Sequence, residues 1–110
     1  MKKLVVYIEK SKQDLNEIYN YIAYYLYNEI AAKRIIVKIM SKIKQLSEFP
    51  FLYPINSDFK IKNNSVRSFS VENFIVFYTV ESETDTVLIL SVIYSKRDIL
   101  NSDFTNCIER

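Results

Sequence analysis

The side chains that could carry chemistry in this sequence are cations, carboxylates and tyrosines, because histidine is absent and Cys107 is the only cysteine. Without histidine the chain has no Ser–His or Cys–His nucleophile and lacks the usual proton carrier near neutral pH. A zinc site would have to combine one thiol with carboxylates, and the absence of glycine excludes a glycine-rich phosphate loop. We therefore expect neither a metal nor another cofactor, and any catalysis must use Lys, Arg, Tyr, Asp or Glu.

The basic residues are unevenly distributed, although the formal net charge of +2 is too small to indicate nucleic-acid binding by itself. Residues 30–47 contain several lysines and one arginine but no acidic residue. Arg34, Lys38 and Lys42 follow one another at helical spacing and so should line one face of a helix. This stripe could dock a polyanion or an acidic partner, whereas a solvated helix face is the more common origin of such a pattern.

The elements that would position these residues begin with a strand over residues 3–8, which are β-branched and aromatic. Ser11 and Asp14 have the spacing of a capping box and predict a first helix that continues to about Leu26. Asn28 is a plausible cap for a second helix, which the pair Phe49-Pro50 ends. The short connection predicts a helical hairpin.

Residues 50–65 are rich in Pro, Asn, Ser and Asp and predict a loop. Three strand-like runs follow, over residues 66–71, 74–80 and 87–94, and their short connections predict an antiparallel meander. The expected fold is α+β in the order β-α-α-β-β-β, with a helical hairpin packed on a small antiparallel sheet. We expect a single domain over residues 1–110. No apolar run approaches the roughly 20 residues that span a bilayer, which predicts a cytoplasmic chain without a membrane partner.

The last two predicted strands carry apolar groups on both faces, as the runs 76–78 and 88–90 illustrate. A small antiparallel sheet usually leaves one face in water, and one helical hairpin covers only one side. The second face would then be covered by the rest of the chain, by a second copy or by another protein. Tyr78, in the middle of this region, is a candidate contact for such a partner.

Several phrases of the sequence are similar to the RelE/ParE toxin superfamily of type II toxin–antitoxin systems. They occur in the same order from one end of the chain to the other, and the last two resemble the ParE-type signature. The phrases are Asp14-Leu15-x-x-Ile18-x-x-Tyr21-Ile22, Leu46-x-x-Phe49-Pro50, Val66-Arg67-x-x-x-Val71-x-Asn73-Phe74-Ile75-Val76-Phe77-Tyr78-x-Val80 and Val92-x-Tyr94-x-Lys96-Arg97-Asp98.

The resemblance implies a toxin that arrests growth or stabilises a plasmid and is neutralised by a cognate antitoxin covering its sheet. RelE-like members cut mRNA on the ribosome, and ParE-like members inhibit DNA gyrase without being nucleases. In the RelE-like pattern Arg67 would be one of the cations that stabilise the phosphate. Arg97 or Lys96 would be the cation from the end of the chain. Tyr94 would be the candidate general acid. The apolar Ile75 stands where that pattern has an arginine.

We therefore expect a ParE-like toxin that acts by binding DNA gyrase, with the region of Arg67, Lys96 and Arg97 as its active surface. One alternative is a RelE-like ribosome-dependent endoribonuclease that uses Arg67, Arg97 and Tyr94. A second is an inactive module that still binds an antitoxin. Arg34, Lys38, Lys42 and Tyr78 remain the candidate antitoxin contacts.

Overall fold

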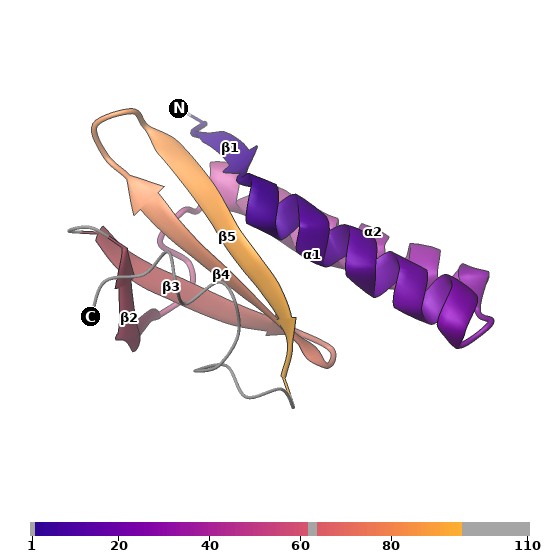
Figure 1. Ribbon diagram of the computed structural model, residues 1–110. Helices are drawn as coiled ribbons and strands as arrows, with labels where there is room; N and C mark the ends of the chain where they lie inside the picture. Colours follow the sequence, from indigo (N-terminus) through magenta and orange to yellow (C-terminus); the bar gives the residue numbers. More distant parts are fainter. Residues whose placement is uncertain (1, 62–63, 96–110) are drawn as a thin grey trace.

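The fold is a pair of long helices packed on one face of a five-stranded mixed sheet (Figure 1). The structure is a computed structural model that describes residues 2–61 and 64–95. Its elements in chain order are β1 (Leu4–Tyr7), α1 (Glu9–Asn20), a π-helical turn (Tyr21–Tyr25), α2 (Glu29–Lys44), a 3-10 turn (Gln45–Ser47), β2 (Ile55–Ile61), β3 (Asn64–Val71), β4 (Phe74–Glu81) and β5 (Thr86–Tyr94). The predicted α+β class is confirmed.

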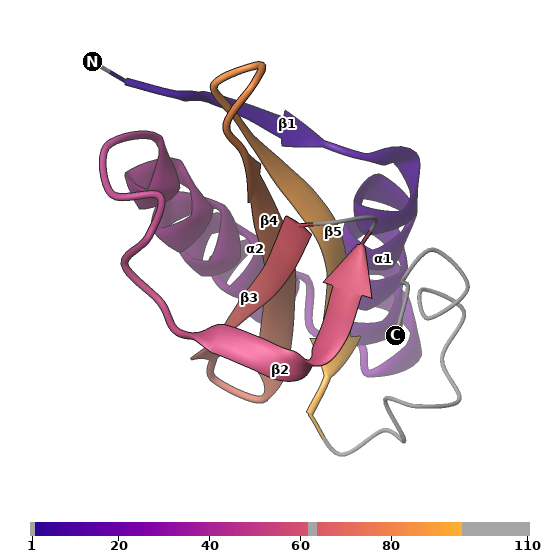
Figure 2. The ribbon, with the colours of Figure 1, turned by 90° about the vertical axis from the view of Figure 1, so that its left-hand side faces the viewer.

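The strands follow the order β1-β5-β4-β3-β2, so β1 and β2 form opposite edges of the sheet (Figure 2). Neighbours from β2 to β5 are antiparallel, which confirms the predicted meander of the last three strands. The first strand instead runs parallel to β5, with Leu4 opposite Thr86. The sheet is therefore mixed, with one parallel pair at its β1 edge and antiparallel pairs elsewhere.

The prediction of a loop over residues 50–65 is wrong, because β2 occupies residues 55–61. Three of the turn-forming residues, Asn56, Ser57 and Asp58, lie where the pairing of β2 with β3 is interrupted, between Ile55 and Lys60. There the side chain of Asn56 accepts a hydrogen bond from the backbone N–H of Asp58. An edge strand tolerates such polar residues and irregular pairing because one of its sides faces solvent.

The helix boundaries follow local chemistry at α2 but not at α1. Asn28 caps α2 as predicted, with its side-chain oxygen accepting from the Ala31 N–H at 3.0 Å. The first helix begins earlier, at Glu9, and the predicted cap Ser11 is fully buried in its first turn, donating to the Ile8 carbonyl at 2.7 Å. Asp14 is also buried, and its carboxylate binds residues of β5 instead of capping the helix.

Asp14 fastens α1 to the sheet at an irregularity of β5. The pairing of β4 with β5 shifts register between Phe77 and Tyr78, leaving Leu90 without an opposite residue. Just beyond this bulge, the Asp14 carboxylate accepts hydrogen bonds from the Ser91 hydroxyl and, at 3.0 Å, from the Val92 N–H. Lys10, one helical turn earlier, forms an ion pair with the same carboxylate. A bulge leaves ladder groups unpaired, and Asp14 supplies the missing acceptor.

Both faces of the sheet are buried in separate clusters. The helix-facing cluster combines the apolar face of α2, including Ile39 and Ile43, with Val76 and Ile89 of the sheet. The second cluster, on the opposite face, contains Phe77 and Leu90. Phe59 of β2 packs edge-on against Phe77, with ring centroids 5.6 Å apart.

The apolar second face that the sequence predicts is therefore buried within the chain itself. The unpredicted β2 contributes to this cover through Phe59. Separately, no helix among residues 2–61 and 64–95 has the length and apolar character needed to cross a membrane.

Candidate functional site

Arg67 lies on β3 directly opposite Tyr78 of β4, and both side chains hold the segment that leads into β2. The Arg67 guanidinium donates to the Tyr53 carbonyl at 2.6 Å and lies over the Phe51 ring, 5.0 Å from its centroid. The Tyr78 hydroxyl donates to the Pro50 carbonyl at 3.0 Å. Two sheet residues thus satisfy two loop carbonyls, which makes Arg67 an anchor rather than a free cation.

Tyr78 is fully buried, so a partner cannot reach it in this conformation. Burial raises the pKa of its hydroxyl, and the nearby Arg67 opposes this rise only in part. The phenol therefore stays neutral and acts as a hydrogen-bond donor to the loop. The structure gives this residue a packing role within the helix-facing cluster.

Tyr94 ends β5 and lies far from Arg67. It is opposite Phe74 on β4, with ring centroids 5.8 Å apart, whereas Arg67 is opposite Tyr78 on that same strand. The two positions are thus separated by four residues along β4 and by two strand spacings, roughly 13 Å and about 10 Å. Arg67 and Tyr94 do not converge on one small group.

The other residues of the predicted target surface are placed as follows. Ile75 is partly buried beside the second cluster and offers no polar group. Lys96 and Arg97 lie outside the described residues. Within residues 2–61 and 64–95, no group of three or more acidic, Cys or His side chains could hold a metal ion.

The basic stripe of α2 is largely engaged with the turn between β3 and β4. Glu72 in that turn has a backbone φ of 53° and receives hydrogen bonds from Arg34 at 2.7 Å and Lys38 at 3.1 Å. Lys42, the third member of the stripe, is partly buried and takes no part in this cluster. Arg34 and Lys38 thus brace the end of the meander against α2, and a partner would have to compete with Glu72 for them.

This cluster predicts a pH-dependent contribution to stability. The hydrogen bonds from Arg34 and Lys38 lower the pKa of Glu72 below its unfolded value. A lowered carboxyl pKa means that the stabilisation is present above the unfolded pKa and is lost as the pH falls through the folded one. The melting temperature of the wild type should therefore exceed that of Glu72→Gln at pH 7 by an amount that starts to shrink near the unfolded pKa of about 4.3 and disappears only below the lowered folded pKa.

The comparison should be repeated with added salt, because these side chains are exposed and their attraction is screened. A difference in melting temperature that stays constant from pH 7 to pH 3 would contradict the assignment.

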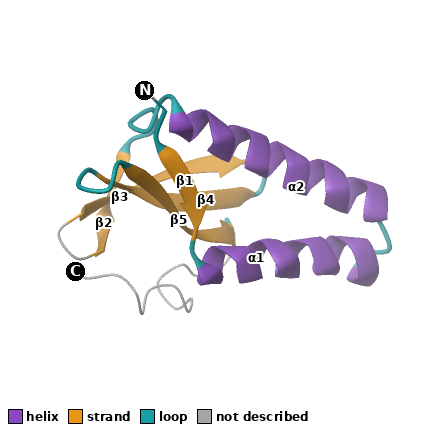
Figure 3. Ribbon diagram, turned by 90° about the horizontal axis from the view of Figure 1, so that it is seen from above, coloured by secondary structure: helices purple, strands orange, loops and turns teal. Residues whose placement is uncertain are grey.

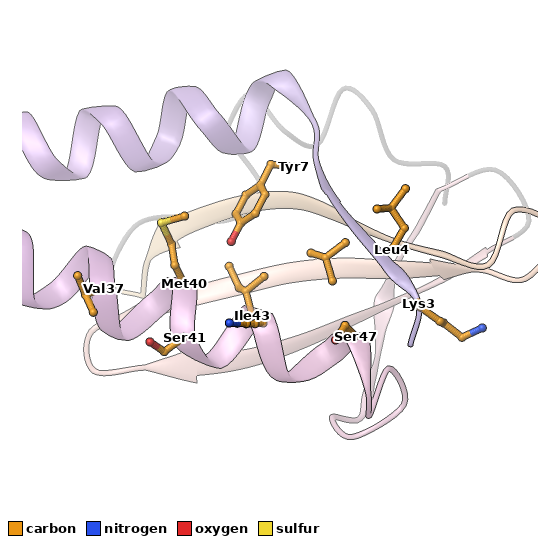
Figure 4. A pocket seen from close by; sticks show the side chains of 10 residues that line it. Lys3, Leu4, Tyr7, Val37, Met40, Ser41, Ile43 and Ser47 are labelled. Carbon is orange, nitrogen blue, oxygen red and sulfur yellow. The ribbon is translucent and has the colours of Figure 1, made fainter. Parts of the chain in front are cut away.

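A groove between β1 and α2 is the surface feature that the sequence patterns did not reveal (Figure 4). It has a volume of about 490 Å³. Tyr7 points from β1 toward α2, and Met40 rises from α2 beside it. The lining residues are Lys3, Leu4, Val5, Tyr7, Val37, Met40, Ser41, Ile43, Lys44 and Ser47. Val37 and Met40 are exposed at helical spacing beside the core face of α2. This second apolar face is the sequence feature that could have predicted the groove.

The backbone of β1 adds polar groups to the mouth of this groove. Among the described residues β1 pairs only with β5, and the Leu4 N–H donates to the Asp85 carbonyl on that side. Because backbone groups alternate sides along a strand, Val5 and Tyr7 direct theirs toward the free edge. Lys44 adds a positive charge to the lining, whereas Lys3, the other lysine there, forms an ion pair with Asp85. The site therefore suits an apolar segment that carries acidic residues.

Comparisons with known proteins agree with this fold. A model of the family described as the ParE toxin of type II toxin–antitoxin systems, parDE, matches residues 5–99. The sequence has no match among curated proteins. The chain is similar to a structure of the chromosomal ParDE system from P. aeruginosa, with 18% identity, 86% of this chain and 98% of that chain covered, and a TM-score of 0.70.

Two further solved structures share the fold at lower similarity. For the toxin–antitoxin complex RelBE2 from Mycobacterium tuberculosis, identity is 16%, coverage is 86% of this chain and 99% of that chain, and the TM-score is 0.54. For the isolated RelE toxin from E. coli, identity is 12%, coverage is 89% of each chain, and the TM-score is 0.55.

Proposed function

Because the chain belongs to the ParE toxin family of type II toxin–antitoxin systems, we propose that it arrests growth by binding its target, DNA gyrase, and not by cutting RNA. The observation that favours target binding over RNA cleavage is the distance between Arg67 and Tyr94. Cleavage of RNA requires a base, a cationic group and an acid that converge on one phosphate. Arg67 is instead committed to the Tyr53 carbonyl, and Ile75, which packs on the opposite face of the sheet from Tyr78, supplies no cation.

The remaining part of the proposed target surface comprises Lys96 and Arg97 beyond the end of β5. A binding toxin does not need these cations at one reacting atom, so their role is compatible with attachment to a large protein target. This distinguishes the proposal from the RelE-like alternative, in which the same residues would have to meet Tyr94 at a scissile bond.

Induced expression of the chain alone tests the proposal. We expect growth to stop and plasmid supercoiling to change, without new ribosome-dependent 5′ ends in the RNA. In a purified assay, the chain should inhibit supercoiling by gyrase, and Lys96→Ala combined with Arg97→Ala should weaken that inhibition about tenfold or more. Lys12→Ala, an exposed cation on α1, is the matched control.

New cuts within codons that disappear in the Arg67→Ala variant would contradict the proposal and establish the endoribonuclease instead. Normal growth of cells expressing the bare chain would contradict both and leave a module that only binds an antitoxin.

The cognate antitoxin is the expected partner, since the similar structures include a ParDE system and a complex described as toxin–antitoxin. We place its docking segment in the groove between β1 and α2. Exposed Val37 and Met40 would bury apolar side chains of that segment, and the free edge of β1 would supply backbone hydrogen bonds.

A further inference from the structure

The far end of the helical hairpin exposes a cluster of aromatic side chains, which we call the tyrosine tip. Figure 3 shows this end of the hairpin projecting beyond the sheet. The tip consists of Tyr21, Tyr24, Tyr25, Leu26, Tyr27 and Ile30, each more than half exposed. Tyr27 is 92% exposed and Ile30 is 83% exposed. Isolated exposed apolar residues are ordinary, but a contiguous patch on the order of several hundred Å² usually marks a binding site.

The backbone at the tip departs from regular α-helical geometry at two places. A π-helical turn over Tyr21–Tyr25 extends α1, and the Leu26 N–H donates to the Tyr21 carbonyl at 3.0 Å. Tyr27 then adopts a φ of 54°, a left-handed conformation that favours glycine or asparagine and disfavours an aromatic residue. Since the Tyr27 ring is almost fully exposed, packing inside the domain does not explain its presence. Contact with another molecule would explain it.

The rings of the tip are arranged in ordered pairs. Tyr21 and Tyr25 are stacked, with centroids 5.2 Å apart and planes inclined by 15°. Tyr24 meets Tyr19 edge-on at 6.3 Å. Such pairs hold the rings in place before a partner arrives, which lowers the entropy lost on binding.

Charge indicates which partner suits the tip. The sequence has no lysine or arginine between Gln13 and Ala32. The exposed carboxylates there are Glu17 and Glu29, and Glu29 accepts a hydrogen bond from the Tyr19 hydroxyl at 3.5 Å. Tyrosine platforms that bind single-stranded nucleic acid need cations along the phosphates. The carboxylates of Glu17 and Glu29 would instead repel the phosphates. A positively charged protein surface is complementary.

We propose that the tyrosine tip is a docking surface for arginine side chains of a partner protein. A guanidinium stacks on the face of a tyrosine ring and donates two parallel hydrogen bonds to a carboxylate. Glu29 lies beside the ring pair of Tyr19 and Tyr24, so one arginine would use a ring and a carboxylate together. Lysine lacks the planar fork and would bind more weakly. The tip lies at the start of α2, whereas Lys44 of the groove lies at its end.

The test is an NMR titration of the isotope-labelled full chain, made by cell-free synthesis, with synthetic helical peptides. One peptide carries four arginines on one face, and matched peptides carry lysine or glutamate at those positions. We expect the arginine peptide to shift the amide signals of residues 17–33, the lysine peptide to bind several-fold more weakly, and the glutamate peptide not to bind. Tyr24→Ser with Tyr25→Ser should weaken arginine-peptide binding about tenfold or more.

Two variants separate binding from folding. Tyr27→Gly should raise the melting temperature, because glycine fits the left-handed position, and should at the same time weaken arginine-peptide binding. Phe49→Ser with Leu52→Ser, which removes exposed apolar side chains elsewhere, should leave binding unchanged.

Equal binding of the arginine peptide by the wild type and the Tyr24/Tyr25 variant would overturn the proposal. A single-stranded oligonucleotide that binds the tip more tightly than the arginine peptide would also overturn it. So would a concentration-dependent dimer of the wild type, seen by sedimentation, that the tip variants abolish, since the occupant would then be a second copy.

Discussion

Asp14→Ala is expected to destabilise the protein by about 3 kcal/mol or more. The substitution leaves the Ser91 hydroxyl and the Val92 N–H without their acceptor in a buried position. It also leaves the Lys10 ammonium, which is only a quarter exposed, without its ionic partner. For a chain of this size the melting temperature should fall by roughly 12 °C or more, which thermal unfolding followed by circular dichroism would measure.

A double-mutant cycle tests whether this loss comes from the bulge of β5. Ser91→Ala alone removes one hydrogen bond and should cost about 1 kcal/mol. The double variant should cost less than the sum of the single variants, because the two side chains share one interaction. Glu17→Ala, an exposed acidic residue on the same helix, is the control and should change stability by less than about 0.5 kcal/mol. Strict additivity of Asp14→Ala and Ser91→Ala would contradict the assignment.

The parts of the fold that the sequence predicted correctly depend on local spacing. The apolar face of α2, its Asn28 cap and the meander of β3 to β5 each follow from residues within a few positions of one another. Helical period, capping and strand alternation act at that range.

The errors arose where distant residues decide the structure. Ser11 and Asp14 have the spacing of a cap, but both are buried, and Asp14 binds Ser91 far along the chain. The polar residues of β2 predict a loop locally, yet Phe59 in that strand packs on Phe77 and helps to cover the second face. Tertiary contacts override local preference in both cases.

The candidate site shows the same limit. The sequence predicts Arg34, Lys38 and Arg67 as cations available to a partner, and Arg34 and Lys38 do share one face of α2. Their partners, Glu72 and the Tyr53 carbonyl, lie on other elements, and no sequence pattern connects them. The groove was missed for a related reason, because Val37 and Met40 become a binding surface only beside β1.

Val37→Glu combined with Met40→Glu is expected to weaken binding of the cognate antitoxin about 100-fold or more, equivalent to about 2.7 kcal/mol. Both side chains are exposed in the free chain, so the fold should tolerate the change. In the complex the two carboxylates would be buried in an apolar contact, and they would repel acidic antitoxin residues that are drawn to Lys44. The matched control is Phe49→Glu with Leu52→Glu, which alters exposed apolar residues outside the groove.

Co-expression of each toxin variant with the product of the adjacent antitoxin gene tests whether the antitoxin and the target bind different surfaces of the toxin. Wild type and control should be neutralised, whereas the groove variant should continue to stop growth in the presence of antitoxin. That result requires the groove variant to be folded and able to reach its target, so it cannot arise from loss of structure. Neutralisation of the groove variant with unchanged affinity would place the antitoxin elsewhere on the toxin. Persistent killing would mean that the antitoxin and the target use separate surfaces, because changing one leaves the other active.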